Sequence, residues 1–149
     1  YECTVQGGRK GSGIDVIQLA TAVEALGCGE ILLNCIDNDG QNDGYDLFLT
    51  RSVRRAVNIP VIASSGAGVP RHFAEVFEVA KVEAALAASI LHKDLVSIGQ
   101  IKEHLTDVGI DVRPTGISKS AWAGVTWSPR LALAVLAVGV LAGVALARR

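Results

Sequence analysis

The sequence predicts an α/β fold built on parallel strands, and three observations support this fold class. Short apolar runs end near Ile36, Ser64 and Ser89, about 25 to 28 residues apart. Segments with the periodicity of amphipathic helices lie between these runs. Polar residues or glycines follow each run directly. Strands that alternate with helices in this way indicate either an open doubly wound sheet or part of a (β/α)8 barrel, and both folds place ligands at the carboxyl ends of their strands.

The chain begins with an alternating pattern over residues 1–6, which predicts a strand. The stretch "GGRKGSG" follows and, because it is rich in glycine and basic residues, we expect a loop there. Farther on, the pattern changes to that of a helix, whose apolar face comprises Ile14, Ile17, Val23 and Leu26. We expect this helix to stop at Gly27, because glycine tolerates the left-handed conformation that ends many helices.

Three pairs of strand and helix follow. The first strand, residues 31–36, is apolar almost throughout, as in a parallel sheet covered on both faces. The polar turn "DGQNDGYD" connects it to a helix over residues 46–57. Pro60 opens the second strand, "VIAS", and Pro70 suits the first turn of the next helix. The third strand covers residues 84–89, and the last helix has an apolar face of Leu95, Ile98, Ile101, Leu105 and Val108 and stops near Gly109.

The residues at the strand ends favour anion binding. Glycine lets a ligand approach backbone amides that no Cβ shields, and Gly40, Gly66 and Gly68 all lie at expected strand ends. The helix that starts at Pro70 would add partial positive charge. Hydroxyl donors are supplied by Ser64, Ser65 and Ser89. These features suit a phosphate group, although "SSGAG" could equally be only a tight turn.

Two carboxylates follow the first strand of the predicted sheet. Asp37 and Asp39 would point to the same side if that strand continued past Ile36. Paired carboxylates can act as acid and base or hold polar substrate groups, whereas an Asp can also cap a turn. We expect one functional and one structural carboxylate. The histidines have no visible partners, and we expect His72 and His104 on solvated helix faces.

Composition limits the classes of function. The 149 residues carry a formal net charge of −1, which gives no general case for nucleic-acid binding. The three cysteines, Cys3, Cys28 and Cys35, lack metal-ligand spacing, so we expect no metal and no disulfide, with Cys28 and Cys35 as reduced core thiols. No residue pattern points to a cofactor. The sequence contains no Met, so we expect it to be the later part of a longer protein, with a processed N-terminus as the alternative.

Four stretches together resemble a known family. They are "YECTVQGGR", "GCGEILLNCIDNDGQNDGYD", "IPVIASSGAG" and "AALAASILH". In combination they resemble the cyclase part of imidazole glycerol phosphate synthase, most closely the fused glutaminase–cyclase form of plants and fungi. The resemblance covers residues 1–113 and implies a (β/α)8 barrel of which the three strands are the sixth, seventh and eighth. It implies closure of an imidazole ring in histidine biosynthesis, with ammonia supplied by a glutaminase domain or subunit.

The resemblance also implies roles for particular residues. One substrate phosphate would be held by Asp39, Gly40, Gly66, Ala88 and Ser89, while Asn34 and Ser64 would line the pocket and Asp37 would lie beside the reacting part of the substrate. The two catalytic aspartates of the family lie on the first and fifth strands, which would precede Tyr1. We therefore expect no cyclase turnover from this polypeptide alone, and we expect exposed apolar strand edges.

Beyond residue 113 the resemblance ends. We expect a linker over residues 114–130 and a hydrophobic helix over residues 131–149. The uncharged run from Leu131 to Ala147 would be about 25 Å long as a helix, which is short for a hydrocarbon core of about 30 Å. It is either a membrane anchor or a C-terminus whose hydrophobicity is accidental.

Two functions therefore remain open. The first is a cyclase fragment that acts on a small phosphorylated substrate, resident in a plastid or the cytoplasm. The alternative is a non-catalytic, membrane-tethered half-barrel that binds phosphate or acts as a scaffold. A membrane location would follow only if the apolar tail is genuine.

Overall fold

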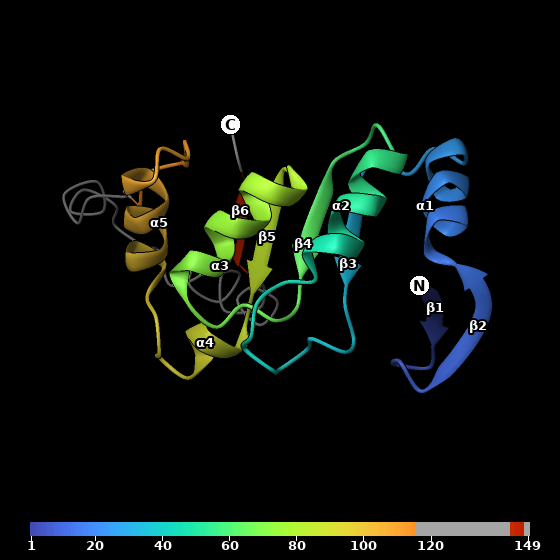
Figure 1. Cartoon of the computed structure of the whole chain (residues 1–149), viewed down its shortest axis with the longest axis horizontal. Helices are drawn as coiled ribbons and strands as arrows, with labels where there is room; N and C mark the ends of the chain where they lie inside the picture. Colours follow the sequence, from blue (N-terminus) through green and yellow to red (C-terminus); the bar gives the residue numbers. More distant parts are fainter. Residues whose placement is uncertain (116–143, 148–149) are drawn as a thin grey trace, which may run out of the picture.

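The computed structural model describes residues 1–115 and the backbone of residues 144–147 (Figure 1). The elements in chain order are β1 (Glu2–Val5), β2 (Lys10–Asp15), α1 (Val16–Ala25), β3 (Ile31–Asn34), α2 (Leu47–Ala56), β4 (Val61–Ser64), α3 (Pro70–Glu75), the π-helix η1 (Val76–Ala80), β5 (Ala84–Ala87), α4 (Ser89–His92), α5 (Ile98–Asp107) and β6 (Val144–Ala147). The hairpin β1–β2 and α1 lie at one end of the molecule, and α5 lies at the other.

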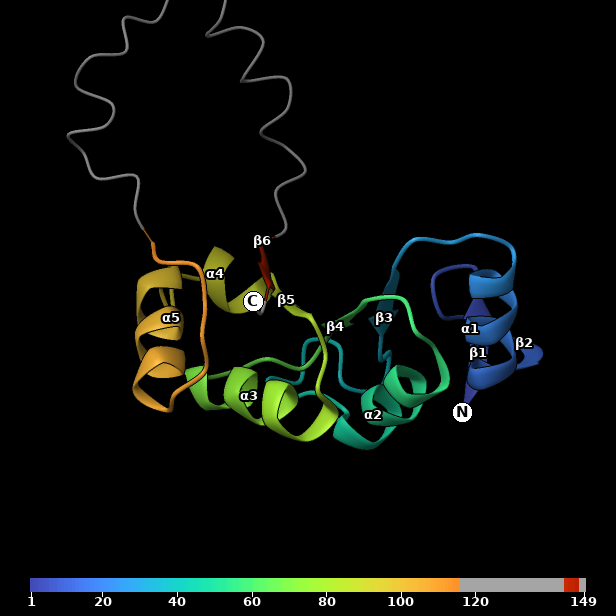
Figure 2. The same ribbon diagram turned by 90° about the horizontal axis from the view of Figure 1, so that it is seen from above.

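The central sheet has the strand order β3-β4-β5-β6, and β3, β4 and β5 are parallel. Ile31 pairs with Val61, and Ile62 pairs with Ala84, so the three strands start at the same edge. Figure 2 shows α2 and α3 on the same side of this sheet. This arrangement confirms the predicted alternation of parallel strands and helices. It is consistent with part of a (β/α)8 barrel, although the described strands do not close one.

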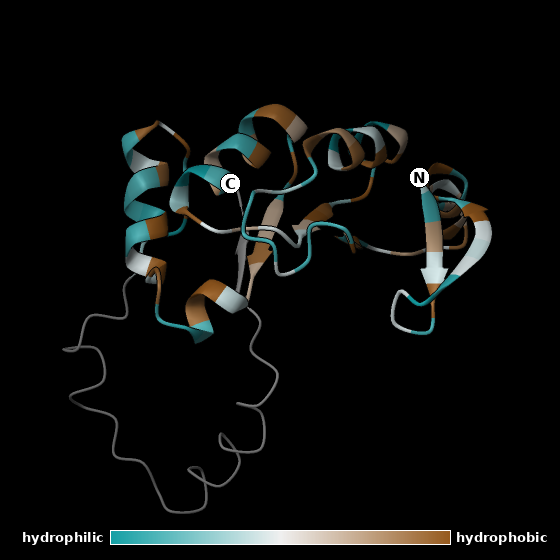
Figure 3. Cartoon of the chain, turned by 60° about the horizontal axis from the view of Figure 1, so that its bottom comes forward, coloured by the Kyte–Doolittle hydropathy of each residue, from teal (hydrophilic) through white to brown (hydrophobic). Residues whose placement is uncertain are grey.

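The core lies between the sheet and its helices. Phe73, Phe77, Val53 and Val61 are fully buried there. Burying one such side chain contributes about 1.5–3 kcal/mol, so this layer is the main source of stability. In Figure 3 the strands β4 and β5 are mainly hydrophobic, whereas the loop after β3 is mainly hydrophilic. The polar loops are thus held at the carboxyl edge of an apolar sheet.

Helix starts follow the local capping residues. Asp15 caps α1 by accepting a hydrogen bond from the amide of Ile17 (2.9 Å), so the helix begins at Val16 and not at Ile14. Asp46 caps α2 in the same way through the amide of Leu49 (2.8 Å), close to the predicted start. The structure also adds α4, where a continuing strand was expected to reach Ser89.

The expected loop "GGRKGSG" is only partly a loop. Lys10–Asp15 forms strand β2, which pairs antiparallel with β1. The turn between them uses positive φ at Gln6, Gly7 and Gly8. Glycines within β2 weaken the alternating pattern by which a strand is predicted, and the sequence prediction was therefore wrong for this segment.

The C-terminal prediction also needs correction. Val144–Ala147 is a strand that pairs antiparallel with β5, so the predicted helix over residues 131–149 is wrong for these four residues. The carbonyl and amide groups of the β5 edge provide a partner for an apolar segment, and strand pairing satisfies them. Residues 116–143 and 148–149, which include most of the predicted linker and of the apolar run from Leu131, lie outside the described residues. Among the described helices, none has the length and apolar character needed to cross a membrane.

The two edges of the parallel strands differ. The edge of β3 that faces away from β4 pairs with no strand in the described part of the chain. Leu32 on β3 is 55% exposed. The corresponding edge of β5 is covered by β6. The prediction of exposed strand edges is therefore correct for β3 and wrong for β5.

Candidate functional site

The candidate site lies where the loops after β3, β4 and β5 meet at the carboxyl edge of the sheet. Asn34 ends β3 and Ser64 ends β4, and the two residues are paired in register. The side-chain oxygen of Asn34 accepts hydrogen bonds from the hydroxyls of Ser64 (3.1 Å) and Ser65 (2.6 Å). The structure therefore brings together three of the residues predicted from the sequence.

Ser65 and Gly66 turn the chain sharply after β4. Ser65 has a φ of 79° and Gly66 a φ of 95°, both in the left-handed region that side chains other than glycine rarely adopt. The short hydrogen bond to Asn34 holds Ser65 in this conformation. A Cβ on Gly66 would collide with the carbonyl of Gly44, so the position requires glycine for space as well as for φ.

A chain of hydrogen bonds orders the loop after β3. The amide of Gly44 donates to the carbonyl of Gly66 (2.7 Å), and the side-chain amide of Asn38 donates to the carbonyl of Gly44 (2.8 Å). The thiol of the buried Cys35 in turn donates to the side-chain oxygen of Asn38 (3.3 Å). Burial raises the pKa of Cys35 and keeps it a neutral donor. The loops after β3 and β4 are therefore joined through their backbones.

Tyr45 joins the same loop to β5. It is buried, and its hydroxyl donates to the carbonyl of Leu86 (3.0 Å). Its ring makes an edge-to-face contact with Phe73 at a centroid distance of 5.7 Å. Burial raises the pKa of Tyr45 well above its ordinary range, so the hydroxyl stays protonated and acts as a donor. The loop after β3 is thus held both to the loop after β4 and to strand β5.

Gly66 and Ala67 are among the residues of the turn after β4 whose amides have no hydrogen-bond partner in the described part of the chain. Both residues are buried. Buried backbone amides are almost always paired, because an unpaired one costs about as much free energy as a lost hydrogen bond. Adjacent free amides that follow a left-handed residue are typical of an anion-binding nest. These two amides are the clearest indication of a ligand in this structure.

The other predicted site residues lie near this edge but are less closely connected. Asp37, Asp39 and Gly40 are exposed, and Gly40 has a φ of 77°. Because β3 ends at Asn34, the two carboxylates lie in a turn, and the expectation that they share one side of a strand does not apply. Asn34, Asp37 and Asp39 line a hollow of about 760 Å³ between β3 and the N-terminal hairpin.

The third loop supplies Ala88 and Ser89. Ala88 is exposed, and the half-buried Ser89 begins α4. Gly68 lies beside the loop after β3, where a Cβ would collide with the carbonyl of Asn42. No cluster of residues among those described has the composition of a metal site.

Several residues that shape the site were not predicted from the sequence. His72 was expected on a solvated face, but it is buried and its Nδ1 accepts a hydrogen bond from the amide of Gly68 (3.1 Å). Asn38 and Tyr45 act through loop contacts that periodicity does not reveal. Cys28 was expected in the core and is exposed, whereas Cys35 is buried as expected and all three cysteines are free.

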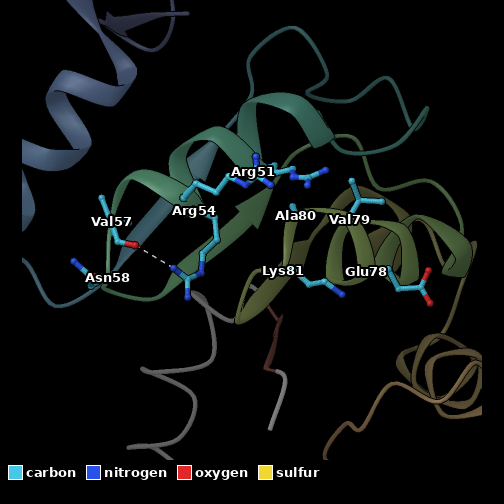
Figure 4. Close-up of a pocket in the computed structure, with 9 residues that line it drawn as sticks. Arg51, Arg54, Val57, Asn58, Glu78, Val79, Ala80 and Lys81 are labelled. Atoms are coloured by element: carbon cyan, nitrogen blue, oxygen red, sulfur yellow. Dashed lines mark hydrogen bonds between the residues drawn. The ribbon is translucent and has the colours of Figure 1, made fainter.

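A second hollow lies far from the strand-end loops. It is formed by the end of α2 and by η1, and Figure 4 shows that Arg51, Arg54 and Lys81 line it. The guanidinium of Arg54 pairs with Glu83 (2.7 Å) and donates to the carbonyl of Val57 (3.1 Å). This cationic side chain therefore connects α2 to the start of β5 and is structural.

Comparison with known proteins agrees with this geometry. A family model described as "Histidine biosynthesis protein" matches residues 1–97. The chain is 58% identical over 113 residues to the protein named imidazole glycerol phosphate synthase hisHF, chloroplastic, of Arabidopsis thaliana, which covers 76% of this chain and 19% of that protein. The corresponding hisHF protein of Emericella nidulans is 55% identical over 113 residues, with 76% and 20% coverage.

A separate subunit is also similar. The imidazole glycerol phosphate synthase subunit HisF of Metallosphaera sedula is 52% identical over 109 residues, which cover 73% of this chain and 43% of that subunit. The chain thus spans about a fifth of the fused relatives and less than half of the HisF subunit.

Proposed function

Because the chain belongs to the histidine biosynthesis protein family, we propose that it supplies the phosphate-binding part of an imidazole glycerol phosphate synthase cyclase. The observation that carries this proposal is the turn at the buried residues Gly66 and Ala67, whose amides have no hydrogen-bond partner in the described part of the chain. They lie at the carboxyl edge of a parallel sheet, where folds of this class bind ligands. Gly40, Ala88 and Ser89 complete the proposed phosphate site from the loops on either side.

Each predicted residue has a role that suits its position. The amides of Gly66 and Ala67 are the proposed hydrogen-bond donors to the anion, because neither has another acceptor in the described chain. Asn34 orients the hydroxyls of Ser64 and Ser65 through its side-chain oxygen, so these three residues form one polar cluster at the ends of β3 and β4. Asp37 and Asp39 are acceptors for hydroxyl or amine groups of the substrate.

The reaction in this proposal takes ammonia and a phosphoribosyl-formimino carboxamide ribotide and gives imidazole glycerol phosphate and aminoimidazole carboxamide ribotide. A glutaminase, in the same protein or as a subunit, would supply the ammonia. The role of this chain is to bind and orient one phosphorylated end of that substrate. Residence in a plastid or the cytoplasm is part of the same proposal and is supported by the chloroplastic relative.

A titration with inorganic phosphate and with glycerol phosphate tests the site. In the 15N-labelled chain, we expect the amide resonances of Gly66 and Ala67 to shift in a saturable way. Ser89→Asp should weaken binding by placing a negative charge at the site. Ser52→Asp is the matched control: Ser52 is also half-buried, lies on α2 and donates to the carbonyl of Phe48 (2.8 Å). Phosphate that shifts neither amide, or equal effects of the two substitutions, would contradict the proposal.

The non-catalytic membrane-tethered half-barrel is the weaker candidate. No described helix is long and apolar enough to cross a membrane, and the relatives carry the name of an enzyme. The cyclase proposal is therefore the function that the geometry supports best.

A further inference from the structure

His72 occupies an unusual position for a helical histidine. It is the third residue of α3, the residue is 7% exposed, and its Nδ1 lies 3.1 Å from the amide of Gly68. The amide must donate, so Nδ1 is an acceptor and the ring carries its proton on Nε2. The ring is used here for the lone pair of Nδ1.

The contact serves a helix that lacks an ordinary cap. The N-cap residue of α3 is Val69, whose side chain cannot accept a hydrogen bond, and Pro70 follows it. In a capping box, a side chain at the third helical position reaches back to a backbone amide just before the helix. His72 does this with a ring nitrogen, and it reaches Gly68, one residue before Val69. The bond closes the turn between the loop and the helix.

The same contact fixes the loop after β4. The carbonyl of Gly66 is held by the amide of Gly44, and Gly68 lies against the carbonyl of Asn42. With His72 on the amide of Gly68, both ends of the segment from Gly66 to Gly68 are fixed. The amides of Gly66 and Ala67 in this segment remain without a partner in the described chain.

We propose that His72 is a positioning residue of the phosphate loop. By accepting the amide of Gly68, it directs that amide away from the ligand and leaves the amides of Gly66 and Ala67 to bind the anion. This inference rests on the proposed function for the identity of the ligand. The contact itself can be tested without any ligand, so the two can fail separately.

Substitutions at position 72 can separate the acceptor from the bulk of the ring. His72→Asn places an amide oxygen close to the position of Nδ1, whereas His72→Gln places it closer to Nε2. His72→Leu keeps an apolar side chain of moderate size and has no acceptor. All three variants are made in the full 149-residue chain.

Inorganic phosphate is the probe for binding. We expect His72→Asn to bind it within about twofold of the unsubstituted chain, and His72→Leu and His72→Gln to bind about fivefold to tenfold more weakly, as for the loss of one hydrogen bond. Amide exchange at Gly68 should accelerate in His72→Leu and in His72→Gln but not in His72→Asn. If the ring of His72 only packs in the core, His72→Asn should bind phosphate as weakly as His72→Leu does.

The outcomes are separable. If the unsubstituted chain binds no phosphate, the proposed function fails, and exchange at Gly68 still decides the role of His72. If His72→Leu does not fold, the comparison of His72→Asn with His72→Gln gives the same answer. Two results would overturn the inference: unchanged exchange at Gly68 in the variants without a correctly placed acceptor, or a long-range 1H–15N spectrum that places the ring proton of His72 on Nδ1.

Discussion

The hydroxyl of Tyr45 donates a hydrogen bond to the carbonyl oxygen of Leu86, 3.0 Å away, and so connects the loop after β3 to strand β5. The two residues are 41 positions apart in the chain, and β4 lies between the strands that they join. Tyr45 is buried and Leu86 is half-buried, so the bond is partly shielded from competition with water. It is one of the contacts that hold the loop after β3 in place over the sheet.

The burial of Tyr45 predicts that the folded chain loses stability at alkaline pH. Burial raises the pKa of Tyr45 above its ordinary value of 10.0, so the folded state holds the phenolic proton more tightly than the unfolded state does. The resulting stabilisation is complete below about pH 10 and is lost as the pH rises toward the folded pKa. Urea unfolding above about pH 10 should therefore show a falling free energy of unfolding.

Tyr45→Phe checks the assignment. It should lower the free energy of unfolding at neutral pH by about 0.5–1.5 kcal/mol and make the alkaline loss shallower. Tyr1→Phe is the control, because Tyr1 is 54% exposed although its hydrogen bond to Asp46 also raises its pKa. An alkaline slope that is the same in Tyr45→Phe as in the unsubstituted chain would contradict this prediction.

Gly66→Ala should damage the turn after β4 by two effects. The substitution forces a side chain into a φ of 95° and drives its Cβ into the carbonyl of Gly44. Gly27 is a matched control, because it has the same φ but a Cβ at that position would meet no atom within 4 Å. We expect Gly27→Ala to cost about 1–2 kcal/mol and Gly66→Ala to cost more. Equal losses in urea unfolding would mean that the collision is relieved by movement of the loop.

The sequence predicts the main part of this fold because parallel strands and amphipathic helices have strong patterns. The helix that was expected over residues 46–57 is α2, and the strand "VIAS" is β4. The failures have identifiable causes. Strand β2 contains glycines, which weaken alternation, and β6 is an apolar segment whose conformation depends on the edge of β5.

The candidate site likewise contains residues that were predicted from the sequence and residues that were not. Ser64 and Ser65 were predicted from their place at a strand end and Asn34 from the family resemblance, and the structure brings the three together. His72 and Tyr45 were not predicted as site residues, because their functions depend on a backbone group of another segment. No periodicity in the sequence indicates which carbonyl or amide a buried polar side chain will reach.

The opposite edge of the sheet depends on Glu83. Its carboxylate accepts hydrogen bonds from the Nε of Arg54 (2.9 Å) and from the amide of Val61 (2.9 Å). Glu83→Ala would leave both donors without this partner, and we expect the free energy of unfolding to fall by about 1–3 kcal/mol.

Glu75→Ala is the matched control for Glu83→Ala. Both glutamate side chains are 37% exposed and both are in ion pairs, but Glu75 pairs only with Arg71, whose side chain is 70% exposed. A surface pair of this kind contributes about 0–1 kcal/mol. Urea unfolding of the two variants should therefore give clearly different midpoints, and equal midpoints would mean that the Arg54 contact contributes little.

The 149-residue chain without a partner should not close the imidazole ring. General acid–base catalysis needs groups held within hydrogen-bond reach of the reacting atoms. Asp37 and Asp39 are exposed in a turn, and neither side chain makes a hydrogen bond to any described residue. The assay supplies an ammonium salt and the phosphorylated substrate, and a sample that binds phosphate serves as the control for folding. Turnover above a protein-free blank that Asp37→Asn or Asp39→Asn abolishes would contradict this prediction and would show that the turn after β3 is catalytic.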